Sequence, residues 1–339
     1  MVGTKARKKP SGSSSNNSPI TATRVDYQQP LLDVFSSAFS DVISSTTFPS
    51  LLRDIKRALF DRDFTAAFSD ERRLDAYAAR WSPPRALCYA ATLVELAPRL
   101  QELLCGDDED EDEDEGREIE DTLRFLCVGG GAAELAATAA YTRDTSSRVA
   151  LTLVDAAPWS HVVELVHQRL CVAPTLSKYA SAAAVAANAP FICGSRLSVD
   201  FCRHDVLSLS HHGLAELLGS HPLLVTLLFT LNEMYTQGGL AKTTAFIRSL
   251  GEALPSSSLL LVMDSPGSYS EAVVGKEKRR YPMQWLLDHT LLDTETQGCR
   301  WEKLESRDSL WFRLPETLSY PIQLEDMRYQ MHLYQLFKC

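Results

Sequence analysis

Residues 123–155 read LRFLCVGGGAAELAATAAYTRDTSSRVALTLVD, and this stretch decides the fold. An apolar strand at 125–128 enters three consecutive glycines, and a helix of small residues at 132–140 follows at once. A second apolar strand at 149–154 ends on an acid, Asp155. Strand, glycine loop, helix, strand and acid, in this order, form the first half of a nucleotide-binding Rossmann unit.

The glycine loop and Asp155 predict where a nucleotide binds. Gly129, Gly130 and Gly131 are expected to bring backbone N–H groups close to the ligand, because no side chain blocks the approach. Asp155 lies 24 residues beyond Gly131, where a carboxylate accepts hydrogen bonds from both ribose hydroxyls. The alternative is a tight turn between strand and helix in some other α/β enzyme.

Glu134 distinguishes between nucleotides. A dinucleotide fingerprint has the form G-x-G-x-x-G, and Glu134 occupies the position of its third glycine. A buried carboxylate near a helix N-terminus repels pyrophosphate, but it accepts hydrogen bonds from a cationic amino-acid group. The residues therefore favour S-adenosylmethionine (SAM), whose methionine end carries an ammonium and a sulfonium, over NAD.

Composition predicts a soluble globular protein, since 45% of the residues are apolar and 23% are charged. The net charge of −10 comes almost entirely from nine consecutive acids at 107–115, so an RNA partner is not excluded. The apolar run near 223–231 is far shorter than the roughly 20 residues that span a bilayer, so we expect no membrane association. The eight cysteines form no C-x-x-C pair and no metal-ligand spacing, which predicts reduced structural thiols in an intracellular protein without a metal, with a catalytic cysteine as the alternative.

Changes in composition predict the domain organisation. The basic, Ser-rich start contains Lys-Ala-Arg-Lys-Lys-Pro at 5–10, which is typical of a nuclear localisation signal, a phosphate-binding tail or a merely solubilising tail. We therefore expect the protein in the nucleus or nucleolus, with the cytoplasm as a further location. The expected regions are a disordered basic arm at 1–28, a helical region at 29–105, an acidic disordered linker at 106–118 and a catalytic domain at 119–339.

Within the helical region, Pro83 and Pro84 predict the start of a helix with Ser82 as its N-cap. Arg80 and Arg85 flank this turn, beside a tryptophan. They are candidates for contact with an RNA substrate or for closing over the cofactor, and helix packing around the tryptophan is the alternative.

Two further segments are expected to bind the adenosine. Trp159 follows Asp155 by four residues and can lie against an adenine face or pack under the sheet. A third strand at 197–201 precedes Asp205 and Val206. The Asp205 carboxylate can accept a hydrogen bond from the adenine amino group while the next backbone N–H bonds the ring. Capping of the following helix is the alternative role of Asp205.

The chemistry is expected where the most apolar strand, 223–229, ends, because α/β sheets place their sites at the carboxyl ends of central strands. Asn232, Glu233 and Tyr235 follow this strand and form the predicted catalytic loop, with helix capping as the alternative role of Asn232. Asp264 ends the fifth strand, at 258–263.

A basic segment and two late strands complete the chain. Lys276, Lys278, Arg279 and Arg280 suit phosphate contact, and an ordinary solvated loop is the alternative. A helix at 283–292 and strands at 308–314 and 327–337 follow. Five βα units that end on a strand pair fit a seven-stranded methyltransferase sheet better than a six-stranded dehydrogenase sheet.

Several of these segments together resemble the fungal 25S ribosomal RNA (uridine-N3)-methyltransferases. The resemblance covers residues 30 to 339 outside the acidic insert and is most specific in FTLNE and YPMQWLLDHTLL. The segments are ARWSPPRALCYA, VGGGAAEL, LVDAAPW, DVL at 205–207, LLFTLNEMY, VMDSPGSYS, KRRYPMQWLLDHTLL and YQMHLYQLFK.

The resemblance implies a seven-stranded Rossmann-like class I methyltransferase with an N-terminal helical extension, which methylates N3 of a uridine in large-subunit ribosomal RNA. It implies that the partner is ribosomal RNA or the precursor of the large subunit, and we expect the protein to be a monomer. By position, the three glycines and Glu134 hold the methionine end of SAM, Asp155 the ribose, and Asp205 with Val206 the adenine. Cys127 and Ala133 depart from the general methyltransferase pattern, in place of an acid and of a third glycine.

The same positions suggest a mechanism. Uridine N3 loses a proton when it attacks the methyl group, and we expect Glu233 or Asp264 to accept it. Asn232 or Tyr235 then fixes the base edge. Since N3 lies on the Watson–Crick edge, the target must be unpaired or flipped out. Other readings of the sequence are an NAD(P)-dependent oxidoreductase, a non-catalytic SAM-fold factor for ribosome assembly, and a methyltransferase for proteins or small molecules.

Overall fold

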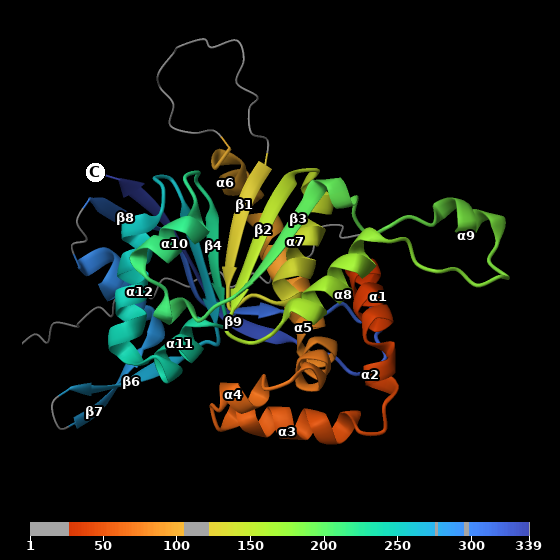
Figure 1. Cartoon of the computed structure of the whole chain (residues 1–339), viewed down its shortest axis with the longest axis horizontal. Coiled ribbons are helices and arrows are strands. Elements are labelled where there is room, and N and C mark those ends of the chain that lie inside the picture. The colour runs from red at the N-terminus through yellow and green to blue at the C-terminus, as the bar shows by residue number, and fades with distance from the viewer. Residues whose placement is uncertain (1–26, 105–121, 275–276, 295–297, 339) are drawn as a thin grey trace, which may run out of the picture.

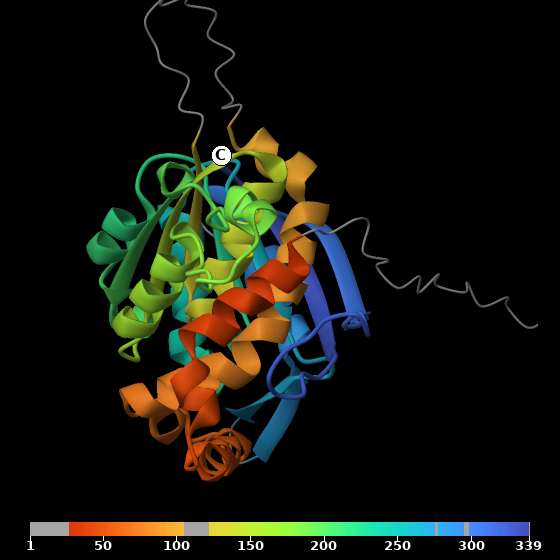
Figure 2. The same ribbon diagram turned by 90° about the vertical axis from the view of Figure 1, so that its right-hand side faces the viewer.

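A seven-stranded sheet with helices on both faces forms the centre of the computed structural model, which describes residues 27–104, 122–274, 277–294 and 298–338 (Figures 1 and 2). The strand order is β3-β2-β1-β4-β5-β9-β8, so the expected seven-stranded fold is confirmed. The acidic run and most of the basic arm lie outside the described residues. The strands are β1 (Thr122–Val128), β2 (Arg148–Asp155), β3 (Leu197–Arg203), β4 (Leu224–Leu228), β5 (Leu259–Asp264), β8 (Cys299–Phe312) and β9 (Met327–Lys338).

Strand direction places the functional edge of this sheet. Strands β1 to β5 run parallel, and β9 runs antiparallel between β5 and β8. The carboxyl ends of the five parallel strands therefore meet at one edge. The central strand β4 is buried at every residue, as its continuous apolar run predicted.

Three elements differ from the expectation. Strand β8 begins at Cys299 rather than near 308, because its first residues, 299–302, alternate between buried apolar and exposed charged side chains. Segment 230–235 is the beginning of a helix, α11, and not a loop. The expected helix at 283–292 is an α-helix followed by a π-helical turn. These helices are α11 (Leu231–Gln237), α13 (Met283–Asp288) and η3 (His289–Asp293).

The N-terminal helical region packs against one face of the sheet together with the alanine-rich helix after the glycine loop (Figure 2). The small side chains of that helix let its neighbour approach closely. The helices of this part of the chain are α1 (Gln28–Ala38), α2 (Ser40–Ser44), α3 (Phe48–Phe60), α4 (Phe64–Ala67), α5 (Glu71–Glu95), α6 (Ala97–Glu102), α7 (Ala132–Thr145) and α8 (Ser160–Cys171). Of these, α3 and α4 lie below the carboxyl edge of the parallel strands (Figure 1).

Helix α5 continues through Pro83 and Pro84, so the prediction that a helix starts there with Ser82 as its N-cap is wrong. Its N-cap is Asp70, whose carboxylate accepts a hydrogen bond from the Arg73 backbone N–H at 3.1 Å. Proline lacks the N–H that would bond four residues back. The Tyr320 hydroxyl replaces it by donating to the Ala79 carbonyl at 2.8 Å, which keeps this buried helix turn satisfied.

The other face carries a second core, and a two-stranded hairpin lies beyond the sheet edge (Figure 1). No described helix is long and apolar enough to cross a membrane. Cys88, Cys127, Cys171, Cys193 and Cys202 form no disulfide bond, and the described residues contain no group of His, Cys, Asp or Glu that could hold a metal. The remaining elements are α9 (Ala182–Ala187), α10 (His211–Leu218), α12 (Gly239–Ala253), β6 (Tyr269–Val274), β7 (Glu277–Pro282) and the short turns η1 (Gly194–Arg196) and η2 (Val206–Ser208).

Candidate functional site

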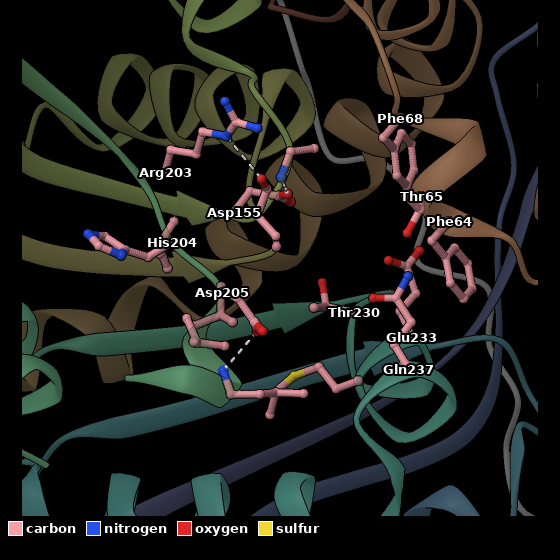
Figure 3. Close-up of a pocket in the computed structure, with 18 of the residues that line it drawn as sticks. Phe64, Thr65, Phe68, Asp155, Arg203, His204, Asp205, Thr230, Glu233 and Gln237 are labelled. Carbon is pink, nitrogen blue, oxygen red and sulfur yellow. Dashed lines mark hydrogen bonds between the residues drawn. The ribbon is translucent and has the colours of Figure 1, made fainter. Parts of the chain in front are cut away.

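Two adjoining cavities lie at the carboxyl ends of β1, β2 and β4, and Figure 3 shows residues that line the larger of them. The larger has a volume of about 300 Å³ and the smaller about 40 Å³. Both are lined by the same five residues at their junction, so a single extended ligand can occupy them together. These residues are Phe68, Gly129, Asp155, Thr230 and Glu233.

The glycine loop forms the floor of both cavities. Gly129 adopts a φ of +71°, and a Cβ atom there would lie 2.3 Å from the Thr230 hydroxyl oxygen, so only glycine fits. Gly131 lines the smaller cavity. Gly130 lines neither cavity and instead packs against Cys127, where an added Cβ would lie 2.7 Å from the Cys127 Cβ. The structure thus places two of the three predicted glycines at the ligand.

Glu134 points back to the glycine loop. Its Oε2 accepts a hydrogen bond from the Gly131 backbone N–H at 2.8 Å, which completes the first turn of α7. The side chain is buried at the smaller cavity, and this burial raises the pKa of its carboxyl. A buried anion here favours a cationic group in the cavity.

Asp155 ends β2 at the junction of the cavities. Its Oδ1 accepts a hydrogen bond from the Ala157 backbone N–H at 2.7 Å, which fixes the carboxylate. Burial, together with the negative charge of Glu134, raises the pKa of Asp155 to about 7. This carboxylate therefore gains from any partner that donates hydrogen bonds or carries positive charge.

Asp205 and Val206 line the far side of the larger cavity, where Figure 3 shows Asp205 across from Asp155. Asp205 Oδ1 also accepts a hydrogen bond from the Leu207 backbone N–H at 3.0 Å, so it caps the turn η2 as well. Trp159 lines the smaller cavity instead, with its ring against Gly131 and edge-on to Tyr77 at a centroid distance of 5.8 Å. The structure therefore separates Trp159 from the two residues predicted to bind adenine.

Glu233 is the predicted catalytic residue that reaches the cavities. It lies on the first turn of α11 and lines both of them. Burial and the nearby negative charges of Asp155 and Asp264 raise the pKa of Glu233 to about 8, although the Arg85 guanidinium opposes this shift. A carboxylate with such a pKa is a strong proton acceptor once it is ionised, at a pH near or above 8.

The other predicted catalytic residues do not line either cavity. Asp264 is buried and accepts hydrogen bonds from the backbone N–H groups of Asn232 and Ser265 and from the Ser268 hydroxyl, at 3.2, 2.7 and 3.0 Å. Tyr235 is buried in the core below α11. Of the two candidate bases, Glu233 therefore lines the cavities, whereas Asp264 holds the first turn of α11 in place.

Arg85 lies inside the site, a position that suits the second role predicted for it, closing over the cofactor, better than contact with RNA. It projects from α5 into the smaller cavity, hydrogen-bonds the Tyr77 hydroxyl and lies over the Phe229 ring at 5.1 Å. Arg80 instead forms an ion pair with Glu325 at 2.8 Å and lines neither cavity. Lys276 lies outside the described residues, and so do the side chains of Lys278, Arg279 and Arg280 on β7.

Sequence reasoning missed two features of the site. Phe64, Phe68 and Tyr77 form a wall from the N-terminal helical region, which had no recognisable ligand motif. Phe229 has a φ of +61°, an uncommon backbone conformation for an aromatic residue, at the turn from β4 into α11. Such strain concentrates at functional sites.

The charges of the two cavities favour a cation. Four carboxylates and two guanidinium groups line them, which leaves an excess of negative charge when all are ionised. SAM carries a nucleoside and a net positive amino-acid end, so the residues present fit it. The six charged groups are Glu134, Asp155, Asp205, Glu233, Arg85 and Arg203.

Comparison with known proteins gives evidence on the family of this chain that does not depend on the geometry of the site. Residues 35–335 match the model of a family described as "Putative SAM-dependent methyltransferase". The chain is also 30% identical, over 339 aligned residues, to the 25S rRNA (uridine(2843)-N(3))-methyltransferase of Saccharomyces cerevisiae. That alignment covers 90% of this chain and 85% of the yeast protein.

Solved structures show more distant similarity. The N-methyltransferase NodS of Bradyrhizobium japonicum, in complex with S-adenosyl-L-homocysteine, is 13% identical with a TM-score of 0.37, over 86% of this chain and 98% of NodS. A mutant of the 16S rRNA (adenine(1408)-N(1))-methyltransferase from Catenulisporales acidiphilia is 12% identical with a TM-score of 0.35, over 64% of this chain and 85% of that chain.

Proposed function

Since the chain belongs to the SAM-dependent methyltransferase family, we propose that it transfers the methyl group of SAM to N3 of a uridine in large-subunit ribosomal RNA. The observation that carries this proposal is Glu233, a half-buried carboxylate with a pKa near 8 at the junction of two negatively charged cavities. Such a group can accept a proton beside a bound cation. The similarity to the yeast uridine-N3 enzyme supports the choice of acceptor atom.

The two cavities divide the binding of SAM. Asp155 would hold the ribose hydroxyls, and Asp205 with Val206 the adenine, all in the larger cavity. Glu134 and Gly131 would hold the methionine ammonium in the smaller cavity, where Arg85 can bind the methionine carboxylate. When bound, SAM supplies a methyl group that its sulfonium has already made electrophilic.

The chain's own residues then have two tasks. Positioning supplies most of the acceleration, because the acceptor nitrogen must lie in line with the bond that breaks. The Glu233 carboxylate accepts the proton from uridine N3, which frees the lone pair of the nitrogen for attack. Phe64 and Phe68 border the cavity and exclude water from it.

The acceptor must present its Watson–Crick edge, so the target uridine is unpaired or flipped out when it enters. We further propose that the protein acts as a monomer on the large-subunit precursor, in the nucleus or nucleolus. The basic segment 5–10 supports this location, and a fluorescent fusion with and without that segment tests it.

The direct test combines purified protein, isotope-labelled SAM and large-subunit ribosomal RNA from cells that lack this activity. The RNA is digested to nucleosides and analysed by mass spectrometry. A stoichiometric gain of 3-methyluridine is expected. Label in another nucleoside would overturn the proposal that uridine N3 is the acceptor atom. Absence of label despite SAM binding would overturn the proposal that ribosomal RNA is the acceptor.

A further inference from the structure

Three rings form a stacked ladder outside the cavities. Tyr281 and Trp285 stack with a centroid distance of 5.2 Å and an interplanar angle of 19°. Trp285 and His289 stack at 5.2 Å and 9°. The positions are four residues apart, so one row of α13 and the π-helical turn η3 carries the last two rings. We call Tyr281, Trp285 and His289 the ring ladder.

The ring ladder is anchored at one end and exposed at the other. Tyr281 packs against the core cluster on this face of the sheet. Trp285 is 48% exposed, and the His289 side chain is 54% exposed. Ring stacking alone does not require such exposure, so the two outer rings are accessible to a partner. The outer end of the ladder is therefore open to solvent, where His289 Nδ1 also pairs with the Asp293 carboxylate at 3.3 Å.

The anchored end begins at the catalytic edge of the sheet. The Met283 backbone N–H donates to the Ser268 carbonyl at 2.9 Å, and the Ser268 hydroxyl donates to Asp264 at 3.0 Å. Helix α11, which carries Glu233, contacts the hairpin strand β6, as Figure 1 shows at the lower edge of the molecule. The ring ladder thus leads away from the site along α13.

Its chemistry matches nucleic acid better than protein. The sequence directly before Tyr281 is Lys278-Arg279-Arg280, so the strand that leads into the ladder has a high density of positive charge. Stacked aromatic rings beside basic residues are the combination with which proteins hold unpaired nucleotides. We propose that the ring ladder stacks an unpaired RNA base next to the target uridine, which rests on the proposed function because it assumes an RNA substrate.

Stacking on the ring ladder would help the enzyme to hold a target uridine that has left its base stack. An extruded uridine leaves its neighbours without their stacking partners. A ladder that receives one neighbouring base compensates part of this cost, and it does so for any base because every base has an aromatic face. Trp285 at the centre of the ladder also keeps the His289 ring parallel to the stack.

The test measures binding of a short fluorescent oligouridylate to the full chain, without methyl transfer. We expect Trp285→Ala and His289→Ala each to weaken this binding by about tenfold, because the first removes the ring that supports the stack and the second removes its outer face; Trp285→Phe should retain most of the binding. The same oligouridylate annealed to its complementary strand should bind the wild type and Trp285→Ala equally, since paired bases cannot stack on the ladder. Tyr179→Ala is the matched control, because Tyr179 is 82% exposed but lies away from α13.

Equal oligouridylate affinity in wild type, Trp285→Ala and His289→Ala would overturn the proposal, and it would leave a protein partner as the use of these rings. A thermal shift on SAM addition that equals the wild-type shift confirms that each variant is folded. If Trp285→Ala is not folded, the result for His289→Ala tests the proposal, because His289 is exposed. Failure of the proposed function looks different: there, 3-methyluridine is not formed by the wild type, whatever the ladder binds.

Discussion

The carboxylate of Asp264 accepts a hydrogen bond from the backbone N–H of Asn232 at 3.2 Å, and this contact ties the end of β5 to the first turn of α11. Glu233 is the next residue on that turn. Asp264 therefore acts on the chemistry through the position of Glu233, while its own oxygens are occupied by the backbone and by Ser268.

Glu233→Gln should lower kcat by about 10²- to 10⁴-fold, because the amide cannot accept the N3 proton. SAM affinity should change little, since Gln keeps the shape of the side chain. Steady-state methylation kinetics and calorimetric SAM titration measure the two quantities. Full turnover in this variant would exclude Glu233 as the base.

Asp264→Ala should also lower kcat, although Asp264 does not line the cavities. Three hydrogen bonds are lost, and the first turn of α11 is then free to shift. Asp264→Asn keeps one acceptor oxygen and should recover part of the rate. If Asp264 were itself the base, the asparagine variant would be as inactive as the alanine variant, so the ratio of the two rates distinguishes the roles.

The pH dependence of kcat/KM should show a rise with an inflection near pH 8. The raised pKa of Glu233 means that its carboxyl is protonated, and unable to act as a base, below this pH. As pH rises through 8 the carboxylate forms and the rate increases to a plateau. Glu233→Gln should lose this inflection, and the same inflection in both proteins would assign it to another group, such as uridine N3.

SAM binding should weaken as the pH falls below 7. The pKa of Asp155 is raised to about 7 in the free protein, and a hydrogen-bond donor or cation stabilises its ionised form, so binding favours proton release. Calorimetry in two buffers of different ionisation enthalpy measures the released protons. Asp155→Asn should weaken SAM binding roughly 10- to 100-fold, because a charge-assisted hydrogen bond is lost. The variant should also release fewer protons on binding. If SAM affinity did not depend on pH and were the same in the wild type and Asp155→Asn, Asp155 would not be the ribose-binding residue.

The sequence predicted the parts of the fold and site that depend on local order. The sheet, the glycine loop, Asp155 and Asp205 follow from strands that end on acids, and the parallel arrangement brings those ends together. Arg85 was assigned to RNA because its cavity is formed by segments far apart in the chain. The positive φ of Phe229 has no signal in its residue type, since it depends on the turn between β4 and α11.

The continuous helix α5 gives a prediction about stability. Pro83 cannot donate to the Ala79 carbonyl, and Tyr320, 241 residues away, does so instead. Tyr320→Phe should therefore lower the free energy of unfolding by about 1–3 kcal/mol, since a buried carbonyl loses its partner. Pro83→Ala supplies a backbone N–H to the same carbonyl, so Tyr320→Phe should cost much less in that background. Denaturant unfolding of the wild type, both single variants and the double variant measures this coupling, and strictly additive effects would show that the tyrosine stabilises the helix by packing alone.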